Sequence, residues 1–241
     1  MNETTTSMKH EVSPLLNMKP YHEEDAVTIY HGDCRQIVPM LGRFDMLLTD
    51  PPYGVNFKGK VTKHTKASGG YISGDSEIGP EIVAMCLEKV NRGIVFPGTR
   101  LMREYPAWDD CGGVFCPSGA GMGRWGFACL HPILFYGPRP KRTGMWPTGF
   151  SSFDNADDCG HPCPKPIKWM SWSILLAGDD IKTVLDPFAG SGTTGEAAKL
   201  MGKHAVLIER EERYCEIAAR RLSQDVLPLS TVEHEPETAL L

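Results

Sequence analysis

The part of this sequence that most restricts its fold is residues 182–195, which read KTVLDPFAGSGTTG. A short apolar stretch typical of a buried strand is followed by a glycine-rich turn and then by the start of a helix. The next apolar stretch ends at Glu209, close to the offset of roughly 20 residues at which an acidic side chain binds ribose hydroxyls. The glycines with the spacing G-x-G-x-x-G are Gly190, Gly192 and Gly195. The chain is therefore predicted to contain a βαβ unit that binds a nucleoside.

Three kinds of nucleoside ligand compete for such a loop. ATP would need a P-loop, but Glu196 stands where the P-loop lysine should be. A dinucleotide stays open, because the glycine spacing alone is a weak signal. S-adenosylmethionine is favoured by Asp186 ahead of the loop and by a methyl-acceptor motif at residues 50–53, since its sulfonium and amino acid groups need no phosphate clamp. A loop that only packs a helix is the remaining alternative, and Glu209 downstream argues against it.

The methyl-acceptor motif at residues 50–53 is Asp-Pro-Pro-Tyr, and it follows the apolar stretch 44–49. The lone pair of a nucleobase amine is delocalised into the ring, so a catalyst must localise it with hydrogen-bond acceptors. One acceptor would be an aspartate carboxylate, and the other a carbonyl held by the two prolines. The tyrosine offers a face on which a flipped base can stack. The alternative is a strand that ends in a proline turn. The catalytic candidates are Asp50, Pro51 with its carbonyl, Pro52 and Tyr53.

The order of the two motifs, D-P-P-Y and then D-P-F-A-G-S-G-T-T, resembles that of the β-class amino-group DNA methyltransferases. Residues 30–34, the H-P-x-x-K-P motif at 161–166, and residues 206–209 with Tyr214 fit the same resemblance. It implies an α/β, Rossmann-like methyltransferase fold with a circularly permuted motif order, and S-adenosylmethionine as cofactor. Asp33 would accept the amine of the cofactor adenine, and the H-P-x-x-K-P motif would close over the methionine end. The cofactor-binding residues that it implies are Asp33, Cys34, Lys165, Asp186, Phe188, Ala189, Gly190, Ser191, Gly192, Thr193 and Glu209.

The activity implied by this resemblance is site-specific methylation of duplex DNA, by base flipping and direct displacement. Asp50 at the first motif position favours N6 of adenine, because the enzymes that act on N4 of cytosine more often carry Ser there. Cytosine N4 stays open as the alternative target. An RNA methyltransferase and an inactive cofactor-binding regulatory subunit are less favoured.

Recognition of a DNA site is expected from a short segment at about 137–160, where members of the resembled family usually carry a longer one. Basic residues gather at its start and also in 57–66, directly after the catalytic motif. Phosphate contacts are the functional interpretation of both clusters, and solvated loops are the alternative. The candidate DNA-binding residues are Lys58, Lys60, Lys63, Lys66, Arg139, Lys141 and Arg142.

The length of 241 residues, without an internal linker, suits one doubly wound α/β domain, which we expect to span residues 21–225. Strands are expected near 27–30, 44–49, 93–96, 113–116, 133–136, 183–186 and 205–208, and helices near 80–91, 167–177, 195–201 and 212–224. Their alternation predicts a mainly parallel sheet with ligands at the carboxyl ends of its strands. Asp33, Asp50 and Asp186 follow or form such ends.

The net charge of −5 is compatible with DNA binding once its distribution is considered. Residues 223–241 hold four acidic residues and no Lys or Arg, so the rest of the chain is nearly neutral. Residues 1–20 and the acidic tail 226–241 are expected to be flexible. Double-stranded DNA is the expected partner of a monomer or a homodimer.

The eight cysteines predict no metal site, because their spacings match no common zinc pattern. Reduced, buried cysteines fit a cytoplasmic protein of a bacterium or of a phage-infected host cell. Neither a signal peptide nor a membrane-spanning stretch is expected.

Overall fold

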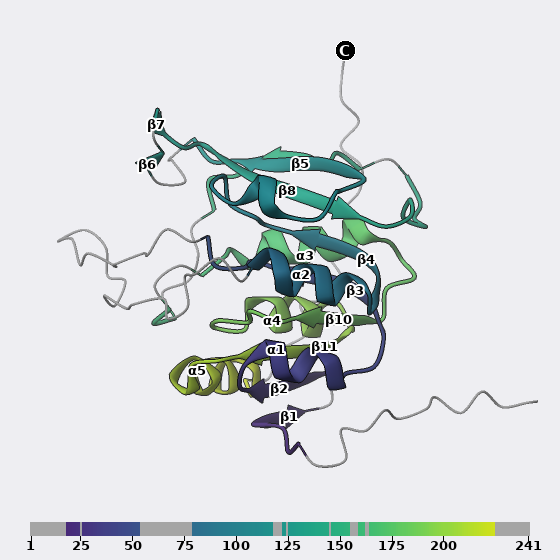
Figure 1. The fold of residues 1–241 in the computed structure, drawn as a ribbon, viewed down its shortest axis with the longest axis vertical. Helices are drawn as coiled ribbons and strands as arrows, with labels where there is room; N and C mark the ends of the chain where they lie inside the picture. The colour runs from purple at the N-terminus through teal and green to yellow at the C-terminus, as the bar shows by residue number, and fades with distance from the viewer. Residues whose placement is uncertain are drawn as a thin grey trace, which may run out of the picture.

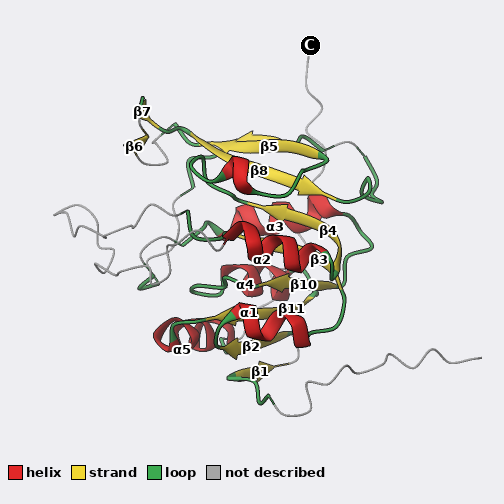
Figure 2. Ribbon diagram, in the orientation of Figure 1, coloured by secondary structure: helices red, strands yellow, loops and turns green. Residues whose placement is uncertain are grey.

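The main feature of the computed structural model is a sheet of nine strands with helices on both faces (Figures 1 and 2). The structure describes residues 18–24, 26–53, 79–117, 122–123, 125–144, 146–154, 159–161 and 164–224. The strands are β1 (His22–Glu24), β2 (Val27–His31), β3 (Phe44–Thr49), β4 (Val90–Val95), β5 (Asp110–Phe115), β6 (Met122–Gly123), β7 (Gly126–Phe127), β8 (Leu130–Tyr136), β9 (Gly149–Ser151), β10 (Thr183–Asp186) and β11 (His204–Glu209). The helices are α1 (Cys34–Ile37), α2 (Gly79–Leu87), α3 (Ile167–Ala177), α4 (Thr193–Leu200) and α5 (Glu212–Leu222), with short 3-10 helices η1 (Val38–Met40) and η2 (Met102–Glu104).

The strands of the large sheet follow the order β1-β2-β11-β10-β3-β4-β8-β5-β9, and β6 pairs with β7 in a separate hairpin. From β2 to β4 all neighbours are parallel, so their carboxyl ends share one edge. β8 is antiparallel to β4 and to β5, and β9 is parallel to β5. The predicted α/β class with a mainly parallel sheet is confirmed. Because β10 and β11 lie between β2 and β3, the glycine-rich loop after β10 comes to lie beside the D-P-P-Y motif after β3.

Alternating apolar side chains give the central strands two buried faces. Met46 and Leu48 of β3 pack on the face that α3, α4 and α5 cover, whereas Leu47 packs on the face that α1 and α2 cover. In β10, Val184 and Leu185 divide between the two faces in the same way. All five side chains are fully buried. Burial on both faces explains why these strands are apolar runs in the sequence.

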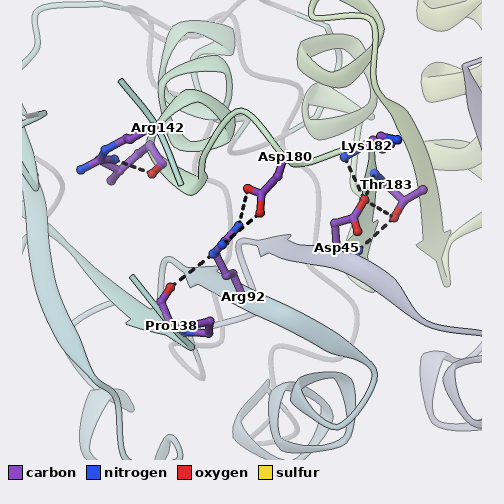
Figure 3. A network of polar contacts seen from close by, with 8 residues as sticks. Asp45, Arg92, Pro138, Arg142, Asp180, Lys182 and Thr183 are labelled. Carbon is purple, nitrogen blue, oxygen red and sulfur yellow. Dashed lines mark hydrogen bonds and ion pairs between the residues drawn. The ribbon is translucent and has the colours of Figure 1, made fainter. Parts of the chain in front are cut away.

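A network of polar contacts joins the starts of β3, β4 and β10 at the opposite, amino edge of the sheet (Figure 3). The guanidinium of Arg92 in β4 donates to both carboxylate oxygens of Asp180, at 2.7 and 3.2 Å, and to the Pro138 carbonyl at 3.2 Å. The Asp45 carboxylate of β3 accepts a hydrogen bond from the backbone N–H of Lys182 at 2.8 Å. These contacts fix the residues before β10 against two neighbouring strands and so position β10 within the sheet.

Some elements differ from those expected from the sequence. The helix expected at 80–91 ends at Leu87, because β4 begins at Val90 and pairs there with β3. The segment 137–160 also contributes a strand, β9, to the sheet. Of the two segments expected to be flexible, 1–20 and 226–241, the structure describes only residues 18–20. Among the helices that the structure describes, none is both long enough and apolar enough to cross a membrane.

Candidate active site

Four acidic residues mark the edge of the sheet where the parallel strands end. Asp33 follows β2, Asp50 follows β3, Asp186 ends β10 and Glu209 ends β11. These strands are consecutive in the sheet, in the order β2-β11-β10-β3, so the four residues lie along one edge. Within the described part of the chain, no three His, Cys, Asp or Glu side chains converge as metal ligands.

Asp186 is a buried carboxylate, 3% exposed, that links the catalytic strand to the glycine-rich loop. One of its oxygens accepts hydrogen bonds from the Thr49 hydroxyl at 2.7 Å and from the Phe188 backbone N–H at 3.1 Å. The other accepts from the Thr194 hydroxyl at 2.6 Å. Burial raises the pKa of this carboxyl to about 6, although these hydrogen bonds favour the charged form. Both oxygens of Asp186 therefore serve to support the loop from within the protein.

The glycine-rich loop between β10 and α4 is held against Glu209. The Glu209 carboxylate accepts hydrogen bonds from the backbone N–H groups of Gly190 at 2.8 Å and of Glu211 at 2.7 Å, and burial raises its pKa. Gly190 has φ = +52°, and a Cβ at this position would lie 3.1 Å from Nε2 of His161. Both the backbone conformation and the close approach of the H-P-x-x-K-P segment therefore favour glycine.

The Asp33 carboxylate caps the short helix α1. It accepts a hydrogen bond from the Arg35 backbone N–H at 2.9 Å and pairs with the Arg35 guanidinium. The hydrogen bond from the Arg35 side chain is the main cause that lowers the pKa of Asp33 to about 2. Cys34 is 6% exposed, and burial raises the pKa of its thiol to about 11. The Cys34 side chain thus belongs to the core, and only its backbone borders the edge.

Asp50 has both carboxylate oxygens engaged by neighbouring side chains. Oδ1 accepts a hydrogen bond of 2.5 Å from the Tyr53 hydroxyl, and Oδ2 is paired with Nζ of Lys165. The Lys165 side chain is only 5% exposed, and that of Asp50 is 22% exposed. Nζ of Lys165 also lies 5.2 Å from the centroid of the Tyr53 ring. The motif expected at the cofactor and the motif expected at the base therefore meet in one ion pair.

The Tyr53 ring packs on the backbone that follows β4. A Cβ at Gly98 would lie 2.7 Å from Cδ1 of Tyr53, and Gly98 has φ = +62°. Tyr105 borders the same motif, because a Cβ at Gly79 would lie 2.8 Å from its hydroxyl oxygen and 3.0 Å from Cβ of Pro51. Sequence reasoning missed Tyr105, since no local pattern connects it with the catalytic motif.

His131, near the start of β8, is a second residue that sequence reasoning missed. Its ring lies 4.9 Å from the Trp169 ring of α3 in an edge-on contact, and Nε1 of Trp169 donates to the Ser152 hydroxyl at 3.0 Å. Burial and the positive charge of Lys165 lower the pKa of His131 to about 4, against the opposing effect of Asp50. A neutral imidazole therefore stands close to the Asp50–Lys165 pair at neutral pH.

The residues predicted to bind phosphate are not gathered beside Asp50 in the described part of the chain. Lys58, Lys60, Lys63 and Lys66 lie outside the described residues. At the amino edge, Arg142 donates to the Leu176 carbonyl at 2.5 Å (Figure 3). The Lys141 carbonyl accepts from the Asp179 N–H at 3.0 Å. Arg139 is exposed and follows Pro138 of the same network. Arg139, Lys141 and Arg142 are thus placed away from the base site.

An exposed apolar surface lies at the carboxyl edge instead. Phe115 ends β5 and Leu130 begins β8, and these two paired residues are 47% and 51% exposed. The β6–β7 hairpin projects from this end of β5 and β8 (Figure 1). Its residue Trp125 is fully exposed. Phe153, 75% exposed, follows β9. Because β5 and β9 run in the same direction as β4, these four residues, the apolar edge, lie on the side of the sheet that also carries Asp50.

Known proteins match part of this chain in sequence. The DNA methylase family model matches residues 138–220, which include Lys165 and the glycine-rich loop. The type II methyltransferase M.HinfI of Haemophilus influenzae is 41% identical over 64 residues, which are 27% of this chain and 18% of that protein. The type II methyltransferase M2.DpnII of Streptococcus pneumoniae is 40% identical over 65 residues, which are 27% of this chain and 24% of that protein. The matched segment thus spans less than a quarter of the length of these curated relatives.

Solved structures match the chain over most of its length. The M1.HpyAVI–SAM complex has a TM-score of 0.60 at 22% identity, covering 82% of this chain and 100% of the other. The PvuII DNA methyltransferase, described as cytosine-N4-specific, has a TM-score of 0.64 at 16% identity, covering 88% of this chain and 91% of the other. At these identities the likeness shows a common fold, that of the S-adenosylmethionine-dependent DNA methyltransferases. The chain is thus similar to DNA methylases in sequence around the glycine-rich loop, and it shares the fold of the solved DNA methyltransferases.

Proposed function

We propose that this chain transfers the methyl group of S-adenosylmethionine to an exocyclic amino group of a base in double-stranded DNA. The observation that carries this proposal is the hydrogen bond from Thr49, the residue before Asp50, to Asp186, which supports the glycine-rich loop. An acceptor carboxylate and a nucleoside-binding loop are therefore adjacent on the neighbouring strands β3 and β10. Methyl transfer requires this adjacency, because the amine and the methyl group must meet in a defined orientation.

The residues around the loop fit S-adenosylmethionine better than a dinucleotide. Residues 186–196 contain no Lys or Arg that could bind a pyrophosphate, whereas Lys165 supplies one cation for one carboxylate. Glu209 ends β11, which is beside β10, and there we place the ribose. Asp33 follows β2, the next strand along the sheet, and there we place the adenine amine. Asp186 acts by holding the loop. The other proposed cofactor-binding residues are Asp33, Cys34 through its backbone, Lys165, Phe188, Ala189, Gly190, Ser191, Gly192, Thr193 and Glu209. The cofactor supplies an electrophilic methyl group when it is bound.

The catalytic roles fall to the D-P-P-Y motif. Asp50 and the Pro51 carbonyl accept hydrogen bonds from the target amine, so that the lone pair of its nitrogen becomes available for attack. Pro52 restricts the backbone, and the Tyr53 ring stacks on the flipped base. The Asp50 carboxylate stabilises the positive charge that develops on the amine nitrogen, and the proton then leaves to solvent. This direct displacement needs no covalent enzyme intermediate.

Adenine N6 is the proposed target. Asp50 supports it, since Ser is more frequent at this motif position in the cytosine-N4 enzymes that the sequence resembles. Cytosine N4 is the second candidate, supported by the fold shared with the PvuII enzyme, which is described as cytosine-N4-specific.

Mass spectrometry of nucleosides tests the proposal directly. The purified protein and its Asp50→Ala variant are incubated with S-adenosylmethionine and either unmethylated duplex DNA or RNA. N6-methyladenine in DNA that forms only with the intact protein is the expected result. N4-methylcytosine would keep the mechanism but change the base, and methylation of RNA alone would change the substrate. Cofactor binding without any methylated nucleoside would favour an inactive regulatory subunit.

The contact between Gly98 and Tyr53 leads to a prediction about the base site. Gly98→Ala places a methyl group against the Tyr53 ring, so the ring must move from the position in which it would receive the base. We expect kcat/KM for DNA methylation to fall roughly 30-fold, which corresponds to about 2 kcal/mol of overpacking. Steady-state kinetics measures this, with the affinity for S-adenosylhomocysteine expected to stay unchanged.

The matched control for this substitution is Gly202→Ala. Gly202 has φ = +63°, close to the +62° of Gly98, but a Cβ there would meet nothing within 4 Å. The Gly202→Ala variant therefore has the same backbone strain as Gly98→Ala but makes no contact with the Tyr53 ring. Equal losses of kcat/KM in the two variants would show that strain, and not displacement of Tyr53, is the cause.

The apolar edge leads to a prediction about DNA binding. Exposed aromatic side chains near a flipped base can stack on neighbouring bases or enter a base step, and such a contact contributes about 1–3 kcal/mol. We expect Trp125→Ala to weaken binding of duplex DNA about tenfold in fluorescence anisotropy at fixed salt. Trp146→Ala is the control, because Trp146 is 41% exposed but precedes β9 on the way from the amino edge. Equal affinities of the two variants would argue against a DNA contact by Trp125.

A further inference from the structure

Both oxygens of Asp50 already have a partner, and these partners compete with a base amine for the carboxylate. The Tyr53 hydroxyl donates to Oδ1 at 2.5 Å, and the Lys165 ammonium is paired with Oδ2. An ammonium beside Asp50 would also oppose the positive charge that develops on the amine nitrogen, since two cations would share one carboxylate. Departure of Lys165 from Asp50 would therefore favour methyl transfer.

A buried lysine leaves one anion only when it gains another. The Lys165 side chain is 5% exposed, and a buried ammonium without a counter-charge is strongly unfavourable. Two neighbouring groups among the described residues cannot take over this role. The imidazole of His131 is neutral or positively charged and supplies no anion, and the Asp186 carboxylate already accepts hydrogen bonds from Thr49, Phe188 and Thr194. The replacement anion is therefore expected to come from a ligand.

The position of Lys165 places its ammonium between the two proposed ligands. Lys165 lies just before α3, in the segment whose His161 approaches within 3.1 Å of the place of a Cβ at Gly190. This segment thus borders the glycine-rich loop after β10, while its lysine reaches Asp50 after β3. The amino acid end of S-adenosylmethionine carries a carboxylate of the kind that Lys165 requires.

We propose that Lys165 is a positioning residue that changes partner during the reaction: the carboxylate of the bound cofactor takes Lys165 from Asp50, and Asp50 becomes free to accept the target amine. This inference rests on the proposed function and adds an order of events to it: the cofactor binds first, and its binding frees Asp50 for the target base. Coupling of this kind is reciprocal. Weakening the hold of Asp50 on Lys165 must therefore strengthen binding of the cofactor carboxylate.

Isothermal titration calorimetry with S-adenosylhomocysteine tests this exchange. The probe keeps the carboxylate but lacks the positive sulfonium, so it is not attracted by Asp50 through its sulfur. We expect Asp50→Asn to tighten binding about fivefold or more, because a neutral amide holds the Lys165 ammonium less strongly. Lys165→Met is expected to weaken binding and to abolish the gain in the double variant. Lys165→Arg, which keeps the charge, is expected to preserve the gain.

Methylthioadenosine, which has no carboxylate, is the control ligand, and Asp50→Asn is expected to leave its affinity unchanged. An equal gain with both ligands would overturn the exchange, because the gain would then not depend on the carboxylate. A gain that survives Lys165→Met would also overturn it, because relief of the repulsion between Asp50 and the ligand carboxylate would then be sufficient. If thermal unfolding shows that Lys165→Met does not fold, the two-ligand comparison in the Asp50→Asn variant, with and without Lys165→Arg, decides the question. Absence of any binding of S-adenosylhomocysteine to the intact protein would overturn the proposed function, whereas binding without the gain overturns only the exchange.

Discussion

Methyl transfer is expected to slow about 10³-fold when Asp50 is replaced by Asn, with cofactor and DNA both saturating. The amide keeps the size of the side chain but removes the charge that would stabilise the developing ammonium, a loss of about 4 kcal/mol. Single-turnover kinetics measures this, because it separates the chemical step from product release. Thermal unfolding of the variant accompanies the kinetics, because Asp50→Asn removes the counter-charge of the buried Lys165 ammonium.

Asp179→Asn serves as the control for this loss. Asp179 is exposed and lies at the amino edge, where its backbone contacts Lys141. The Asp179→Asn variant loses the same charge at a distance from the proposed site. Its rate of methyl transfer should therefore match that of the unaltered chain. A rate for Asp50→Asn within about tenfold of the unaltered protein would show that the Pro51 carbonyl alone directs the amine.

The stability of the unaltered protein relative to an Asp186→Asn variant is expected to fall by about 2 kcal/mol between pH 4 and pH 7. Burial raises the pKa of Asp186 from 3.8 to about 6, so the folded protein holds this proton in a range where the unfolded chain has lost it. Protonated Asp186 therefore raises the free energy of unfolding at low pH, and this contribution is lost as the pH rises through about 4 to 6. Asparagine does not titrate and lacks this decline. Urea unfolding of both proteins across this range measures the difference.

The same measurement on Asp33→Asn tests the sign of this linkage. The Arg35 side chain lowers the pKa of Asp33 to about 2, so its contribution to stability is present above pH 4 and is lost as the pH falls. As the pH rises, the stability of the unaltered protein should therefore fall relative to Asp186→Asn and rise relative to Asp33→Asn. A flat difference for Asp186→Asn would show that its hydrogen bonds from Thr49 and Thr194 offset the effect of burial.

The sequence was sufficient to predict the central strands and the edge at which the acidic residues meet. Apolar runs bounded by Asp50 and Asp186 coincide with β3 and β10, because strands buried on both faces leave a strong local signal. The helix at Ile167–Ala177 was predicted with the observed bounds, since proline before it and glycine after it limit its length. Local sequence patterns were therefore enough to predict the order of these strands and helices and the positions of the motifs on them.

The contacts between distant segments could not be predicted in the same way. Lys165 and Asp50 form their ion pair only when α3 packs beside β3, and no sequence pattern near either residue predicts it. Arg142, predicted to contact phosphate, donates to the Leu176 carbonyl at the end of α3, because the segment that follows β8 passes there. His131 and Tyr105 are ordinary residues in the sequence, and only the tertiary packing brings them to the catalytic motif.

The strand order has a consequence for the way the chain is made. β2 and β3 emerge early from the ribosome, but the two strands that separate them in the sheet, β10 and β11, emerge last. Until then one side of β2 and one side of β3 have no backbone partner, and such open edges attract other chains. We infer that the central sheet closes late in synthesis, and that a fragment ending before residue 183 would aggregate rather than accumulate as a folded half.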